Sequence, residues 1–106
     1  MGSLIEFNDT LKIKTGFPDN LEIGGEYSFS LDDRRVFHLT PIRVFLVEEI
    51  NGKWNFRGHA QILEFTVNAI TNKTSGKFIV SKIYTHEESK TINKLESPEG
   101  KAYEGS

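Results

Sequence analysis

The stretch "PIRVFLVEEINGKWNFRGHAQILEFTVN", residues 41–68, decides the fold class of this chain. Two runs of alternating apolar and polar residues flank Asn51-Gly52, a pair that favours a two-residue type I′ turn because both positions take positive φ. Pairing centred on that turn places Phe45 opposite Gly58. The stretch therefore predicts a long antiparallel β-hairpin.

The two faces of this hairpin differ in polarity along its length. One face carries Phe45, Val47, Trp54, Phe56, Ala60 and Ile62, and it is the predicted core face. The other carries Val44, Leu46, Arg57, His59 and Gln61, followed by Leu63, Phe65 and Val67. A strand pair that is buried on changing sides is expected where a sheet curls into a barrel.

Strand patterns continue on both sides of the hairpin. Alternation within residues 4–13, 21–31 and 76–85 predicts further strands, and the polar residues 68–75 predict the loop before the last of them. The sequence thus predicts a mainly β fold, namely a small antiparallel β-barrel.

One short helix is expected after the last strand. Thr85 has the character of an N-cap, and Glu88 three residues later completes a capping box. Ile92 and Leu95 give this helix its predicted apolar stripe. We expect residues 1–95 to form a single barrel domain and residues 96–106 to form a loose polar tail, since the tail has no apolar pattern.

Bulk composition limits the classes of function. The 106 residues suit one domain, and a net charge of −2 with a pI near 5.9 argues against a wholly basic nucleic-acid binder. The charge is uneven, because residues 51–106 hold eight Lys or Arg against six Asp or Glu. The absence of cysteine excludes disulfides, Cys-ligated zinc and thiol catalysis. Without an apolar run of about 18 residues or a signal peptide, we predict a cytoplasmic protein with no membrane partner.

Catalytic and metal-binding patterns are weak in this chain. The three histidines, His38, His59 and His86, form no HxH or HExxH pattern, and no phosphate-binding loop or nucleophile elbow is present. On the predicted register His59 lies beside Val44, far along the face from His38. We therefore expect no enzyme activity, no metal site and no cofactor.

Basic and aromatic side chains alternate on three consecutive predicted strands. The basic residues are Arg43, Arg57, Lys77 and Lys82, and the aromatic residues between them are Trp54, Phe56 and Tyr84. Cations interleaved with rings are what stacking on a single-stranded base requires. The alternative is a solvated rim above core aromatics, and the sequence leaves both open. The residues we select for ligand binding are Arg43, Trp54, Arg57, His59 and Lys82.

The segment "VFLVEEINGKWNFRGHAQI" resembles the central part of PUA-like barrels, particularly their YTH, EVE and ASCH branches. The resemblance spans about residues 42–88 and rests on an aromatic-x-Gly-x-Ala-x-apolar run, here Phe56, Gly58, Ala60 and Ile62. Later in the chain, Gly76, Phe78, Val80 and Ile83 match the kinds of residue in a following strand. The chain departs from the methyl-base readers because its one tryptophan, Trp54, lies beside the turn.

The resemblance implies a barrel that binds RNA or DNA. Together with the basic and aromatic pattern, it leads to the hypothesis of a non-catalytic module for nucleic acid or a nucleotide-like ligand. The alternative is a structural or protein-interaction barrel that forms a homodimer or binds a protein partner through the apolar part of the mixed face, including Phe65 and Val67.

Overall fold

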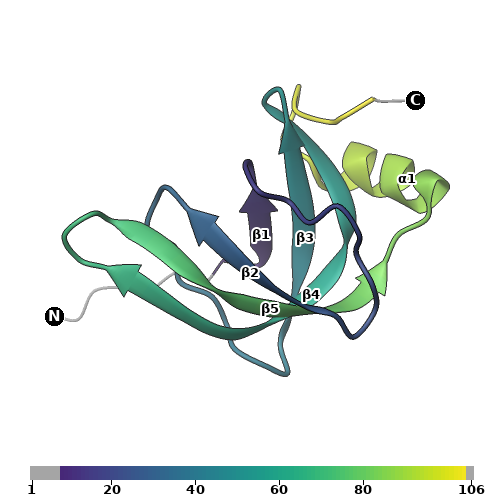
Figure 1. Ribbon diagram of the computed structural model, residues 1–106. Helices are drawn as coiled ribbons and strands as arrows, with labels where there is room; N and C mark the ends of the chain where they lie inside the picture. Colours follow the sequence, from purple (N-terminus) through teal and green to yellow (C-terminus); the bar gives the residue numbers. More distant parts are fainter. Residues whose placement is uncertain (1–7, 105–106) are drawn as a thin grey trace, which may run out of the picture.

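The computed structural model describes residues 8–104, which form one curved five-stranded sheet and one helix (Figure 1). The elements are β1 (Thr10–Ile13), β2 (Glu26–Leu31), β3 (Arg43–Ile50), β4 (Lys53–Asn68), β5 (Lys73–Ile83) and α1 (His86–Glu96). The mainly β class with one short C-terminal helix is confirmed. In the described part of the chain, no helix is both long and apolar enough to cross a bilayer.

Within residues 8–104 the sheet is not closed into a barrel, so the predicted small antiparallel β-barrel is not confirmed beyond its mainly β class. Its strand order is β1-β3-β4-β5-β2, so β1 and β2 are the two edges. The β1–β3 pair is parallel, whereas the other pairs are antiparallel. Of the strand predicted within residues 4–13, residues 4–7 lie outside the described part of the chain.

The β3–β4 hairpin has the predicted turn but not the whole predicted register. Asn51 and Gly52 take φ values of 52° and 79°, as a type I′ turn requires. Pairing follows the prediction only as far as Val47 opposite Phe56, where a bulge places an extra residue in β4. Beyond the bulge Gly58 lies opposite Leu46, not Phe45, and His59 lies opposite Phe45, not Val44.

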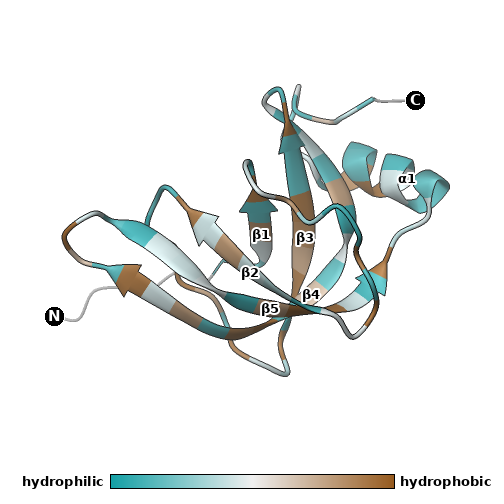
Figure 2. Cartoon of the chain, in the orientation of Figure 1, coloured by the Kyte–Doolittle hydropathy of each residue, from teal (hydrophilic) through white to brown (hydrophobic). Residues whose placement is uncertain are grey.

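The main core lies on one side of this curved sheet. It consists of Leu11, Ile13, Phe29, Leu31, Phe37, Val44, Leu46, Ala60, Ile62, Phe78 and Val80. Bands of apolar and polar residues alternate along the strands in Figure 2, while α1 is mostly polar. The prediction that Phe45 and Trp54 belong to the core face is wrong, because the sheet buries Val44 and Leu46 there instead.

Gly58 allows β4 and β5 to approach each other closely. A Cβ atom at this position would lie 1.9 Å from the carbonyl oxygen of Lys82, a backbone atom that cannot move without shifting the strand. The glycine is therefore required by the contact between strands. It also marks the end of the β4–β5 pairing, since Gly58 lies opposite Ile83, the last residue of β5.

The first part of β4 extends beyond β5, and other segments satisfy its exposed backbone. The amide of Trp54 donates to the carbonyl of Lys101 over 2.6 Å, and its carbonyl accepts from the amide of Tyr103 over 3.1 Å. Residues 101–103 are thus paired with the sheet, which corrects the expectation of a loose tail over residues 96–106 in its described part, and residues 105–106 lie outside the described residues. An uncovered strand edge is a free template for pairing, so this contact closes it.

The helix covers the next part of the same edge through polar side chains. Asn93, which is 2% exposed, accepts from the amide of Phe56 over 2.7 Å and donates to Asn55 Oδ1 and to the Tyr103 carbonyl. The capping box of Thr85 and the residue three positions later is confirmed. The predicted apolar stripe is only partly correct, because Leu95 is 71% exposed.

Replacing Asn93 with alanine should lower the free energy of unfolding by about 1–3 kcal/mol, because the buried amide of Phe56 and the carbonyl of Tyr103 would lose their partner. Urea denaturation followed by circular dichroism measures this loss. Lys94→Ala is the matched control on the exposed side of α1, and it should change stability by no more than about 0.5 kcal/mol. Equal stabilities of the two variants would contradict the role assigned to Asn93.

Candidate functional site

Three of the predicted ligand-binding residues meet on the side of the sheet that faces away from the core. His59 lies in β4 between buried Gly58 and Ala60, so alternation turns its side chain to the opposite face. Lys82 of β5 is its cross-strand partner. Arg43 is exposed and precedes buried Val44, so it lies on the same face as His59.

Two aromatic rings complete this group. The ring centroid of Phe45 lies 5.5 Å from that of His59, in an edge-to-face arrangement. The ring centroid of Tyr84 lies 5.3 Å from that of His59, also edge to face. Lys82 Nζ lies 5.7 Å from the centroid of the Tyr84 ring. We call Arg43, Phe45, His59, Lys82 and Tyr84 the His59 platform.

A short hydrogen bond of 2.6 Å joins the Tyr84 hydroxyl to Nε2 of His59. Burial, and then the charges of Lys82 and Arg43, lower the pKa of His59, so the ring is neutral at neutral pH. Burial, together with Glu88 and Glu96, raises the pKa of Tyr84, which keeps its proton. The hydroxyl donates to Nε2 if the imidazole proton is on Nδ1 and accepts from Nε2 if the proton is there, and Nδ1 itself is buried without a hydrogen-bond partner.

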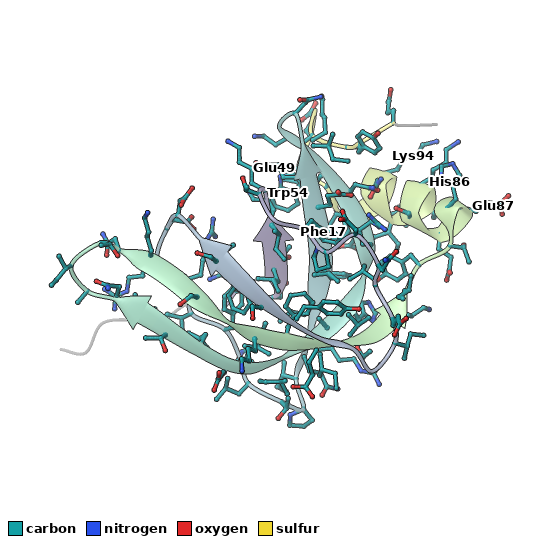
Figure 3. The ribbon with its side chains drawn as sticks, in the orientation of Figure 1. Phe17, Glu49, Trp54, His86, Glu87 and Lys94 are labelled. Carbon is teal, nitrogen blue, oxygen red and sulfur yellow. The ribbon has the colours of Figure 1, made fainter. Side chains whose placement is uncertain are left out.

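Trp54 lies at the far end of a row of rings and outside the His59 platform. Its ring centroid is 6.3 Å from that of Phe56, which in turn is 5.2 Å from that of Phe45. Phe56 lies between Trp54 and the platform and is only 1% exposed. The exposed part of Trp54 is therefore not continuous with the exposed rings of the platform. Lys12 Nζ lies 4.8 Å from the centroid of the indole ring, and Figure 3 shows Trp54 beside Glu49 near the hairpin end.

Arg57 also lies apart from the platform. Its guanidinium pairs with Glu48 at 2.8 Å and lies 5.2 Å from the ring centroid of Phe17, which packs against the core. Arg57 occupies the bulge of β4, and this irregular position breaks the alternation on which the predicted grouping relied. The structure therefore brings together Arg43, His59 and Lys82 and leaves Trp54 and Arg57 elsewhere.

Sequence reasoning placed Phe45 in the core and treated Tyr84 only as a ring between cations. The signal for Tyr84 was its spacing, since it follows Lys82 by two residues and so continues the same face. Phe45 gave no such signal, because its position beside His59 depends on the bulge. Lys77, the other basic residue of the predicted pattern, lies opposite Glu64 and farther along β5 from the platform.

The platform offers ring surfaces and cations, which suit stacking and anion contact. The imidazole of His59 has a phenol as its hydrogen-bond partner. Among residues 8–104, no group of three or more His, Cys, Asp or Glu side chains could hold a metal ion.

A groove of about 690 Å³ lies where the sheet stays open, between the edge strands β1 and β2. Its charged lining residues have both signs: Asp9, Lys12, Lys14, Asp32, Asp33, Arg35 and Glu49. Of the three basic lining residues, Lys12 pairs with Glu49 at 3.2 Å and Arg35 pairs with Asp33 at 2.7 Å. The groove therefore has no single charge preference.

Burial lowers the pKa of His59 most, and the exposed charge of Lys82 should lower it further. Lys82→Gln removes a nearby positive charge, so the pKa of His59 should rise toward its ordinary value, and an NMR titration of the imidazole protons measures it. Because folding lowers the pKa of His59, its neutral form stabilises the fold above the ordinary histidine range, and this stabilisation is lost as pH falls through the folded pKa. Lys77→Gln is the control, and an unchanged pKa in Lys82→Gln would contradict the arrangement.

Comparison of the chain with protein-family models, curated proteins and solved structures finds no match in any of the three. The geometry of the site is therefore the basis for the functional conclusion.

Proposed function

We propose that this chain is a non-catalytic binding module whose His59 platform binds single-stranded nucleic acid or a nucleotide-like ligand. The observation that carries the proposal is the convergence of Arg43, His59 and Lys82 from three neighbouring strands beside two partly exposed rings. Burial is the largest cause of the lowered pKa of His59, and the charges of Lys82 and Arg43, which also lower it, support the proposal because both cations act on the ring.

The chemistry of such binding divides between the rings and the cations. Because the imidazole and the Tyr84 ring lie edge to face, a splayed base would stack on the face of one of them, a contact worth about 1–3 kcal/mol per base. Arg43 and Lys82 would contact the flanking phosphates. Lys82 pairs with Glu88 at 3.5 Å, but both side chains are about half exposed and water screens the pair, so a phosphate can compete with the carboxylate for Lys82.

The resemblance of the sequence to PUA-like barrels implies RNA or DNA as the ligand, and this agrees with the proposal. A cytoplasmic location remains a prediction, and it rests on a cysteine-free composition that suits a reducing compartment.

A protein-interaction role is the second candidate, and an exposed apolar cluster favours it. Leu39 and Ile42 are each 49% exposed and Leu63 is 37% exposed. Leu39 bridges to Ile62, the neighbour of Leu63 in β4, so the three lie around one turn. A second copy of the chain could cover this cluster.

Fluorescence anisotropy with labelled single-stranded RNA and DNA, over a salt series, tests the first proposal. Binding should be saturable and weaken with salt, and Arg43→Ala or Lys82→Ala should each reduce the slope of log affinity against log salt by about 1, as the loss of one phosphate contact predicts. Both side chains are exposed, so neither variant should unfold the protein.

Lys73→Ala is the control, because it removes the same charge at the start of β5, away from the platform. Absence of binding at low salt would reject the nucleic-acid proposal. A dimer in sedimentation equilibrium that dissociates in Ile42→Ser would then support the second candidate.

A further inference from the structure

A pocket of about 320 Å³ lies between the start of β4 and α1, and we call it the helix pocket. Arg57, His86 and Lys90 are its basic lining residues, and none of the residues that line it is an aspartate or a glutamate. The whole chain has 15 acidic residues against 13 Lys and Arg, so a lining without carboxylates is a local departure from the average. The pocket therefore favours an anion.

The cations of the helix pocket retain donors for a ligand. The Arg57 guanidinium carries five N–H donors, and Glu48 engages it through Nη1 at 2.8 Å. Arg57 Cζ lies over the ring of Phe17, 5.2 Å from its centroid. Lys90 is exposed and makes no ion pair with any residue in the described part of the chain. Figure 3 shows His86 at the start of α1 and Lys94 farther along the helix.

The wall behind these cations is a fixed hydrogen-bond network. Asn55 Oδ1 accepts from the Ser89 hydroxyl over 2.8 Å and from Asn93 Nδ2 over 3.1 Å. The Ser89 hydroxyl lies 2.6 Å from the Phe56 carbonyl, so the helix is held against β4 at this point. Since the network already joins helix and strand, the pocket is formed before any ligand arrives.

We propose that the helix pocket binds the phosphate group of a small phosphomonoester, of the size of a mononucleotide or less. Arg57 supplies the planar donors that match phosphate oxygens, and Lys90 supplies a mobile charge at the mouth. The volume is at the lower end of the range of about 300–1,000 Å³ for small-molecule pockets. This site shares Tyr84 with the His59 platform, but Arg43, His59 and Lys82 do not line it.

NMR titration of the ¹⁵N-labelled full chain with adenosine 5′-monophosphate, at constant ionic strength, tests this proposal. The amide signals of residues 85–90 should shift and saturate, whereas adenosine, which lacks the phosphate, should leave them unchanged. Lys90→Gln should weaken the affinity about tenfold, because it removes one charged contact to the phosphate. The matched control Lys94→Gln lies on the same helix outside the pocket and should bind as the unaltered protein does.

Three outcomes would overturn the inference. Equal shifts with adenosine would show that the phosphate is not recognised, and shifts that never saturate would show only weak ionic association. Shifts confined to Arg43, His59 and Lys82 would place the ligand on the platform, which supports the proposed function while rejecting this pocket. Conversely, saturable binding at residues 85–90 with no binding of oligonucleotides would support the pocket and reject the proposed function.

Discussion

The exposed backbone edge at the start of β4 is the constraint on which the arrangement of the chain after β5 depends. β4 has 16 residues and β5 has 11, and β5 stops opposite Gly58. The amides and carbonyls of Trp54 and Phe56 consequently need other partners, since unpaired backbone groups in a packed structure are costly. Tail residues satisfy Trp54, Asn93 satisfies the Phe56 amide, and the Ser89 hydroxyl has its one proton within reach of both the Phe56 carbonyl and Asn55 Oδ1.

Both candidate sites follow from the way in which this edge is covered. The amide of Tyr84 donates to the carbonyl of Arg57 over 2.9 Å, and this bond fixes the turn from β5 into α1. From that position the Tyr84 hydroxyl reaches His59 on one side of the sheet. The helix that follows forms the helix pocket against β4. A polar contact such as that of Asn93 suits this role because it is directional, whereas an apolar stripe would not select one register of the helix.

Local signals in the sequence predicted the features that depend on neighbouring residues. Positive φ at Asn51 and Gly52 and the capping box at Thr85 each involve only a few consecutive positions, and both are confirmed. The bulge in β4 could not be predicted, because it depends on how β3, β4 and β5 fit together in space. One extra residue at Arg57 moved His59 beside Phe45 and removed Arg57 from the predicted group, so the site was predicted only in part. The strand order that leaves β1 and β2 as the two edges could not be predicted for the same reason, because it depends on pairing between segments far apart in the sequence.

The net charge of the chain does not decide whether the His59 platform can attract an anion, because the screening length at physiological salt is about 8 Å. The charges that act on the platform are those of Arg43 and Lys82 on His59, and those of Glu88 and Glu96 on Tyr84. A phosphate that replaces Glu88 as the partner of Lys82 would keep the attraction to Lys82 and gain Arg43, while Glu88 Oε1 keeps its capping bond to the Thr85 amide. The exchange therefore favours a ligand with several negative charges over one with a single charge, even on a protein whose net charge is −2.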